Sequence, residues 1–223
     1  MSSEPFVERA LDPNVVGFLH QPASPAKDAL VLTHGAGSNC RAPLLVEIAE
    51  AFAEAGVLAL RCDLPYRQSS PHGPPKPGAA ERDREGLRNA LAAVRKLAPG
   101  RVTLGGHSYG GRQASMLAAS APGLADALLL LSYPLHPPRQ PERLRVNHFP
   151  QLQTPVLFVH GTRDPFGSED ELSAARTLIP ARTDLFLVVG AGHDLKTGKK
   201  PAPSGELPLA ERIKERWEIF LRM

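Results

Sequence analysis

The sequence has few cysteines, few aromatic residues and no long hydrophobic run, and each shortage excludes a class of protein. Cys40 and Cys62 are the only cysteines among 223 residues, too few for a disulfide framework, and no Cys/His spacing indicates zinc. The longest apolar stretch, 127–131, is far shorter than a membrane span, and the polar, acidic first eight residues are unlike a signal peptide. We therefore expect a cytoplasmic protein with reduced thiols, no metal and no membrane association.

An excess of one charge is also missing. The formal net charge is only +3, and aromatic residues make up 5% of the chain, without a basic stripe that interleaves with them. We therefore expect no nucleic-acid partner. The sequence indicates no protein partner, although it does not exclude one. The length and an apolar content of 42% fit one globular domain over residues 1–223.

Short apolar runs alternate with helix-forming segments, which predicts a mostly parallel sheet with helices on both faces. A hairpin at the start of the chain adds an antiparallel strand at one edge, giving eight strands. The expected strands are 6–11, 15–19, 29–33, 57–60, 102–104, 127–131, 156–159 and 185–189. The expected helices begin near residues 43, 79, 113, 169 and 209, and the second of them carries an apolar stripe that runs to Leu97.

Two loops are rich in proline. The segment 66–78 holds too much proline and glycine for regular structure. The segment 133–154 is too short and too rich in proline to form a helical lid. We therefore predict a single α/β domain without a large lid.

The motif Gly106-His-Ser-Tyr-Gly110 lies between an expected strand and an expected helix. A serine on such a sharp turn needs neighbours without a Cβ two residues before and two after it. The N-terminus of the following helix favours a developing oxyanion. In this setting the chain resembles the α/β-hydrolase superfamily, with Ser108 in the position of the nucleophile.

A serine nucleophile needs a histidine base and an acid that orients it, and both should follow later strands. Asp164 follows the penultimate expected strand and His193 the last, in the chain order of α/β hydrolases. Each has a simpler interpretation, since Asp164 could cap the turn before Pro165 and His193 could lie in a surface turn. The rival acids Asp63 and Asp184 are less well placed.

The oxyanion hole should consist of backbone N–H groups from Tyr109 and from Ala36, within a His34-Gly-Ala-Gly segment that resembles the superfamily's own element. His34 and His107 are expected to brace loops, and His160 is expected to be a core histidine whose ring nitrogens are hydrogen-bonded. Candidate substrate contacts, each of which could instead brace a loop, are Arg112, Tyr66, Arg67, Tyr133 and His136.

Three segments resemble a smaller, lidless group within this superfamily: 104–115, 131–138 and 155–167. The group includes the testis-expressed hydrolase-like protein and a regulatory subunit of the nonspecific-lethal chromatin complex, and the resemblance implies the fold but no substrate. The chain is similar, more loosely, to dienelactone hydrolases. Those enzymes carry cysteine where this chain has Ser108, so their substrate does not carry over.

The motifs together predict a serine hydrolase that needs no cofactor and acts on a small-molecule acyl substrate. The absence of a large lid favours a small or exposed ester or thioester over a long lipid. Two alternatives stay open at this point. One is a scaffold or binding protein that keeps the fold without turnover. The other is an acyltransferase or perhydrolase that uses the same triad with another acceptor.

Overall fold

The computed structural model describes residues 3–197 and 205–223, and in this part of the chain one eight-stranded sheet forms the centre of the molecule. The strand order is β1-β2-β4-β3-β5-β6-β7-β8. The strands are β1 (Ser3–Glu8), β2 (Val15–His20), β3 (Ala29–Thr33), β4 (Leu58–Asp63), β5 (Val102–His107), β6 (Ala127–Leu131), β7 (Val156–Gly161) and β8 (Thr183–Val188). The helices are α1 (Pro43–Glu54), α2 (Pro65–Ser69), α3 (Ala79–Arg95), α4 (Tyr109–Ser120), α5 (Glu169–Arg176) and α6 (Leu209–Arg222).

The sheet is parallel except at one edge. Strand β2 pairs antiparallel with both β1 and β4, whereas all pairs from β4 to β8 are parallel. The predicted hairpin and the mostly parallel, eight-stranded sheet are therefore confirmed. Because the parallel strands all point the same way, the loops that follow them meet at a single edge of the sheet.

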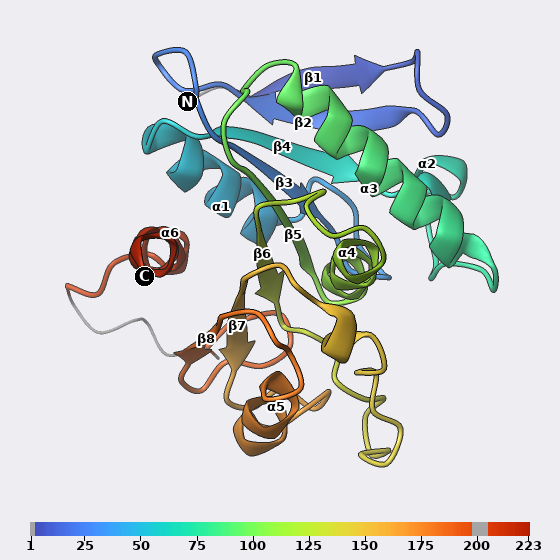
Figure 1. Cartoon of the computed structure of the whole chain (residues 1–223), viewed down its shortest axis with the longest axis vertical. Helices are drawn as coiled ribbons and strands as arrows, with labels where there is room; N and C mark the ends of the chain where they lie inside the picture. The colour runs from blue at the N-terminus through green and yellow to red at the C-terminus, as the bar shows by residue number, and fades with distance from the viewer. Residues whose placement is uncertain (1–2, 198–204) are drawn as a thin grey trace.

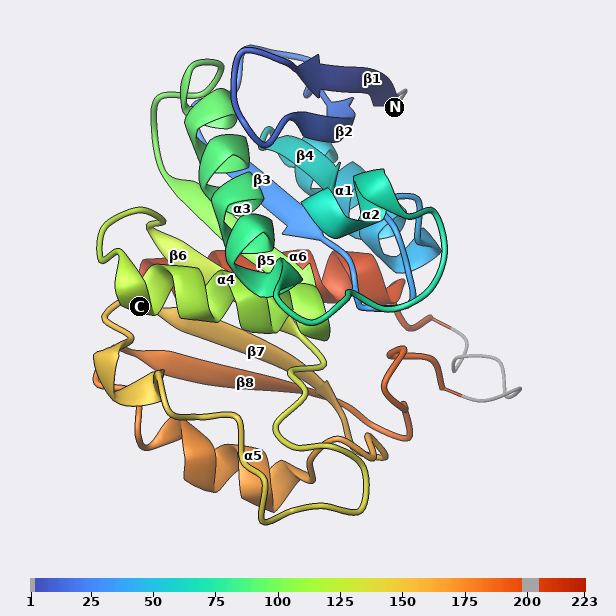
Figure 2. The same cartoon turned by 90° about the vertical axis from the view of Figure 1, so that its right-hand side faces the viewer.

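Helices cover both faces of the sheet, as Figures 1 and 2 show. Helices α1 and α6 lie on one face, and α3, α4 and α5 lie on the other. Along β3, the side chains of Leu30 and Leu32 pack towards α1 and α6, and that of Val31 packs towards α3 and α4. Successive side chains of a strand point to opposite faces, and helices cover both faces here. All three side chains are therefore fully buried.

Three local predictions are wrong. Helix α2 overlaps the start of the segment 66–78, which was expected to be irregular. Pro65 occupies its first turn, where a missing N–H costs nothing. Helix α3 ends at Arg95, so Leu97 does not extend the apolar stripe and is 49% exposed. Helix α4 begins at Tyr109 rather than at 113, because its first turn forms directly behind the serine.

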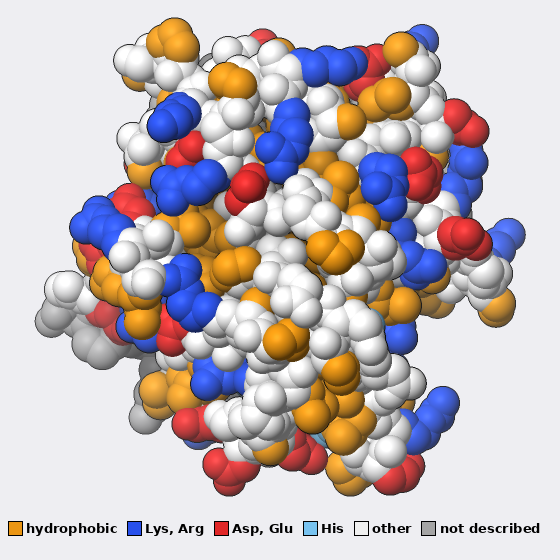
Figure 3. Space-filling view, in the orientation of Figure 1, with side chains coloured by type: hydrophobic (Ala, Val, Ile, Leu, Met, Phe, Trp, Pro, Cys, Tyr) orange, Lys and Arg blue, Asp and Glu red, His pale blue; other side chains and the backbone are white. Residues whose placement is uncertain are grey.

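The prediction of a fold without a large lid is confirmed. Between β6 and β7 the chain forms one turn of 3-10 helix, Phe149–Gln151, and no longer helix. Among the described residues, no helix has both the length and the apolar character needed to cross a bilayer. Figure 3 shows basic and acidic side chains interspersed over the face it presents.

Candidate active site

Ser108 lies on a strained turn between β5 and α4. Its φ of 51° and ψ of −116° are rarely adopted by a residue with a side chain. A Cβ added to Gly106 would lie 2.7 Å from the backbone of Gly110, and one added to Gly110 would lie 2.5 Å from the carbonyl oxygen of His34. The spacing of the two glycines around the serine therefore follows from the lack of room on both sides of the turn.

The structure brings the side chains of Ser108, His193 and Asp164 together. His193 Nε2 lies 2.8 Å from Ser108 Oγ. On the other side of the ring, Nδ1 lies 2.8 Å from Asp164 Oδ2 and 3.0 Å from Oδ1. The three residues come from the turn after β5 and the loops after β7 and β8, all at the carboxyl edge of the sheet. A hydroxyl, an imidazole and a carboxylate thus form one hydrogen-bonded chain.

The carboxylate of Asp164 is fully buried and held in place. The backbone N–H of Phe166 donates to its Oδ1 at 2.9 Å, which fixes the turn after β7. His160 Nε2 donates to the carbonyl oxygen of Gly167 at 2.8 Å, while its buried Nδ1 lies 3.9 Å from Asp164 Oδ2 and has no hydrogen-bond partner among the described residues. The expectation of a fully hydrogen-bonded core histidine is therefore only half right for His160.

The ring and the backbone of His193 are both restrained by neighbours. The ring of Phe166 lies 4.1 Å from that of His193, centroid to centroid, and the ring of His107 lies 5.2 Å away. His107 Nε2 donates a hydrogen bond to the carbonyl oxygen of His193 at 2.7 Å. Burial, and then the proximity of His193, lowers the pKa of His107, which keeps this imidazole neutral.

The loop after β3 passes directly beside the serine. A Cβ added to Gly35 would lie 3.4 Å from the Cβ of Ser108 and 3.0 Å from Nδ1 of His107. The next residue, Ala36, makes no hydrogen bond through its N–H to the described backbone. Tyr109 supplies an N–H from the first turn of α4, where no intrahelical acceptor exists. These two N–H groups are the predicted oxyanion donors.

Tyr66 and Arg67, two of the candidate substrate contacts, are buried and support this loop. The hydroxyl of Tyr66 donates to the carbonyl oxygen of Ala36 at 2.9 Å. The guanidinium of Arg67 donates to four backbone carbonyls, those of Ala36, Ser38, Ser70 and Gly73. Four of the five N–H groups of the guanidinium are therefore already bonded to the protein, so the interpretation of Arg67 as a carboxylate receptor is wrong.

Tyr133 and His136 are also buried. Tyr133 is fully buried and donates from its hydroxyl to the carbonyl oxygen of Arg145 at 2.7 Å. His136 is 5% exposed, with Nδ1 2.8 Å from the carbonyl oxygen of Pro137. Arg112 is only partly buried and its Nε has no hydrogen-bond partner among the described residues, so its contact with a substrate stays a prediction.

The rival acids have other partners. Asp63 accepts a hydrogen bond from the backbone N–H of Cys40 at 2.7 Å and lies 3.4 Å from Nε2 of His34. Asp184 pairs with Arg216 at 2.7 Å. Neither carboxylate is bonded to His193. Among the described residues, no group of three or more His, Cys, Asp and Glu side chains has the arrangement of a metal site.

A cavity of about 250 Å³ adjoins the site on the side of His107. Gly35 and His107 connect it to the surroundings of Ser108, and the segment from Ala42 to Leu45 forms an apolar wall. Asp194 and Lys196, which follow His193, also line it. The cavity can take a short apolar group whose polar end faces these two charges.

The fold and the sequence have known counterparts. Residues 26–218 match the profile of a family described as an alpha/beta hydrolase domain. The chain belongs to this α/β-hydrolase family. Solved structures with the same fold include a serine hydrolase homologue from Coxiella burnetii, 17% identical with a TM-score of 0.71 over 100% of this chain and 97% of that one.

Two further solved structures share the fold. A serine hydrolase without a lid from Xanthomonas campestris is 15% identical to this α/β hydrolase, with a TM-score of 0.70 over 87% of each chain. A dienelactone hydrolase from Anabaena variabilis is 20% identical, with a TM-score of 0.74 over 98% of this chain and 97% of that one. At these identities the likeness concerns the fold.

Three features of this α/β hydrolase were not predicted from its sequence: Asp83, Phe166 and the contact between His107 and His193. Phe166 and His107 carry no signal in sequence, because their partners are brought in by the fold. Asp83 does carry one, since it lies four residues before Leu87 on the apolar stripe of α3. An acidic residue on a buried helix face is rare unless it has partners, and Asp83 is fully buried.

Proposed function

We propose that this protein is a serine hydrolase that cleaves a small ester or thioester through an acyl-enzyme. The observation that carries the proposal is the hydrogen-bonded chain from Ser108 through His193 to Asp164, with distances of 2.8 Å at both links. A serine hydroxyl becomes a useful nucleophile only when such a base takes its proton. The buried carboxylate favours the tautomer of His193 that leaves Nε2 free to accept that proton.

In the first half of the reaction, Ser108 Oγ attacks the acyl carbon while its proton moves to Nε2 of His193. The carbonyl oxygen becomes an oxyanion, which the N–H groups of Ala36 and Tyr109 stabilise by hydrogen bonds. The bond to the leaving alcohol or thiol then breaks, and His193 gives that group its proton. An acyl ester on Ser108 remains.

In the second half, water replaces the leaving group. His193 takes a proton from water as its oxygen attacks the acyl carbon, and the same two N–H groups stabilise the second oxyanion. The bond to Ser108 Oγ breaks, the serine recovers its proton from His193, and a carboxylic acid leaves. No step needs a metal ion or an organic cofactor.

The size of the substrate follows from the cavity beside the site. At about 250 Å³, with apolar residues from Ala42 to Leu45 on one wall, it fits a short acyl or alkyl group. The open segment between β6 and β7 adds no helix that could enclose a long chain. We therefore expect esters of short acids to be better substrates than lipids.

A fluorophosphonate probe tests the proposal, because it reacts with serines that a neighbouring base activates. The wild-type protein should be labelled, and Ser108→Ala should not. Ser115→Ala provides the matched control, since it removes a buried hydroxyl from the same helix and should leave labelling intact. An unlabelled wild type, or equal labelling of Ser108→Ala, would rule the proposal out.

An ester panel graded by acyl length then separates hydrolysis from the alternatives. Turnover that falls with acyl length supports the proposed substrate class. Products that carry an added alcohol or peroxide would instead support an acyltransferase or perhydrolase. Inactivity on the whole panel together with capture of a stoichiometric protein partner would support a scaffold.

A further inference from the structure

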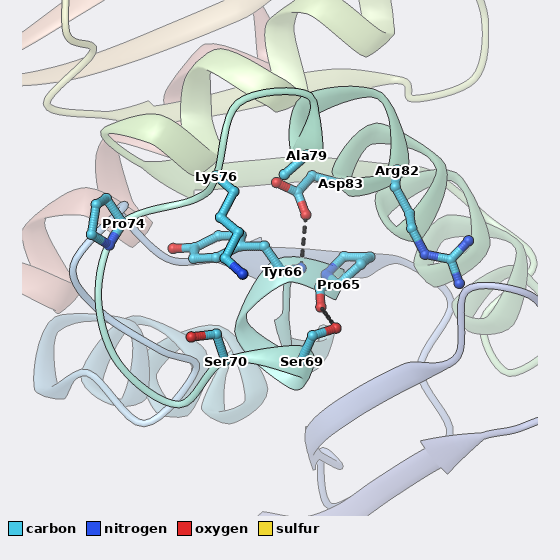
Figure 4. Close-up of a pocket in the computed structure, with 9 residues that line it drawn as sticks. All are labelled: Pro65, Tyr66, Ser69, Ser70, Pro74, Lys76, Ala79, Arg82 and Asp83. Carbon is cyan, nitrogen blue, oxygen red and sulfur yellow. Dashed lines mark hydrogen bonds between the residues drawn. The ribbon is translucent and has the colours of Figure 1, made fainter.

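Asp83 is a fully buried carboxylate on the inner face of α3, outside the triad. Its Oδ1 accepts a hydrogen bond from the backbone N–H of Tyr66 at 3.0 Å, and its Oδ2 accepts one from the hydroxyl of Tyr109 at 2.7 Å. Figure 4 shows the first of these bonds, with the carboxylate directed from α3 onto the start of α2. A buried carboxylate is costly unless its oxygens are bonded, so these two contacts account for its presence.

The bond to Tyr66 replaces a missing helix cap. Helix α2 has five residues, and its N-cap residue, Leu64, has no side chain that accepts from the first turn. So short a helix is unstable by itself, and its first N–H groups lack intrahelical partners. Asp83 supplies the acceptor from a neighbouring helix, and α2 is therefore fixed in position against α3.

Helix α2 in turn holds the loop after β3. The hydroxyl of Tyr66 donates to the carbonyl oxygen of Ala36 at 2.9 Å, and Arg67 Nη2 donates to the same oxygen at 3.1 Å. The same hydroxyl also lies 3.2 Å from the carbonyl oxygen of Gly35, which shares a rigid peptide plane with the N–H of Ala36, so Tyr66 restrains the proposed donor itself.

The second bond of Asp83 reaches the other half of the proposed oxyanion hole. Tyr109 follows Ser108, and its backbone N–H is one of the two proposed donors, while its hydroxyl is bonded to Asp83. The rings of Tyr66 and Tyr109 also meet edge to face, with centroids 5.8 Å apart. One carboxylate is therefore linked to both donors, through Tyr66 to Ala36 and through the side chain of Tyr109 to its own backbone.

We infer that Asp83 is a positioning residue that holds the N–H groups of Ala36 and Tyr109 at a fixed separation. The inference rests on the proposed serine hydrolase function, because only an oxyanion makes that separation matter. An oxyanion hole works by having its donors in place before the charge develops, and the loss of one donor costs roughly 100- to 1,000-fold in kcat. A displaced donor should cost less than a missing one.

Kinetics of short-ester hydrolysis test the inference with four variants. Asp83→Ala removes both acceptors and should lower kcat roughly 10- to 100-fold with KM within about threefold, because the donors act on the transition state. Asp83→Asn should recover most of kcat, since its amide oxygen can accept from Tyr66 and its NH₂ can donate to the oxygen of Tyr109. Tyr109→Phe removes a single bond and should have an intermediate effect.

Tyr133→Phe is the matched control, because it removes another buried phenol, one that is bonded to Arg145 and not to this network. It should keep kcat within about twofold. Wild-type kcat in Asp83→Ala, or an equal loss of kcat in Asp83→Ala and Tyr133→Phe, would overturn the inference. If Asp83→Ala does not fold, the comparison of Tyr109→Phe with Tyr133→Phe decides, and equal kcat values would overturn it.

Hydrogen exchange separates this inference from the proposed function. Amides of residues 34–38 and 66–70 should exchange faster in Asp83→Ala and Tyr109→Phe than in the wild type, and not faster in Tyr133→Phe. A wild type that is inactive towards fluorophosphonate and esters rules out the hydrolase, whatever the exchange shows. An active wild type whose exchange and kcat are unchanged in the Asp83 variants rules out the positioning role alone.

Discussion

His107 donates a hydrogen bond from Nε2 to the backbone carbonyl oxygen of His193 at 2.7 Å. The residue that precedes the proposed nucleophile therefore holds the loop that carries the proposed base. Among the described residues, the only other hydrogen bond between the loop after β8 and the turn at Ser108 joins the side chains of His193 and Ser108. The distance between nucleophile and base thus depends on a side chain whose role is structural.

We predict that His107→Leu lowers kcat about tenfold, because the loop that carries His193 then loses its hydrogen bond to the last residue of β5. His107→Gln should lose less, since its amide NH₂ can donate to the same carbonyl oxygen. Steady-state kinetics on a short ester measure both, with circular dichroism to confirm folding. Equal kcat values for His107→Leu and the wild type would show that the loop needs no such anchor.

The two glycines of the serine turn should tolerate no side chain. Gly110→Ala places a Cβ 2.5 Å from the carbonyl oxygen of His34, and Gly106→Ala places one 2.7 Å from the backbone of Gly110. We expect each to lower the free energy of unfolding by about 1–3 kcal/mol, as overpacked substitutions do. Gly37→Ala is the control, because nothing lies within 4 Å of its added Cβ. Urea denaturation measures all three, and equal stabilities would contradict the steric argument.

The two thiols should be unreactive while the protein is folded. Both Cys40 and Cys62 are free and buried, and burial raises the pKa of Cys40 to about 12, with Asp63 as a further cause. Since the thiolate is the reactive form, a thiol reagent at pH 8 should modify neither residue until denaturant is added. Fast modification of native protein, counted by mass spectrometry, would contradict the observed burial.

Stability should fall as the pH drops from about 6.5 towards 4. Burial, and then Arg61, lowers the pKa of His20 to about 4, and burial, and then Arg112, lowers that of His148 to about 4. In this window the unfolded imidazoles bind protons that the folded ones do not, so acid favours unfolding. Each proton contributes at most about 1.4 kcal/mol per pH unit, and less for His148, which solvent partly screens.

Urea denaturation at pH 7, 6 and 5 measures this slope. His20→Gln should reduce the slope, because glutamine does not titrate and can accept from the guanidinium of Arg61 as His20 does. His72 is exposed, so His72→Gln serves as the control and should leave the slope unchanged. An identical slope in wild type and His20→Gln would contradict the prediction.

Much of the fold can be read from local sequence. Short runs that are wholly or almost wholly apolar, such as 127–131 and 29–33, give central strands with the predicted bounds, because a strand covered on both faces is largely apolar. The order of Ser108, Asp164 and His193 after successive strands also predicts their proximity, since parallel strands end at one edge. Helix α2 could not be predicted in this way, because a carboxylate from α3 caps it.

Local patterns therefore determined the strands, the turn at Ser108 and the residues that could form a triad, since each depends on side-chain period or on the space around a glycine. Tertiary structure alone decided which polar residues are free to meet a substrate. Tyr66 and Arg67 look like site residues in sequence, but backbone carbonyls 29 to 31 positions away accept from the hydroxyl of Tyr66 and from two of the nitrogens of Arg67. Hydrogen-bond partners that distant are fixed by packing, and no sequence period records them.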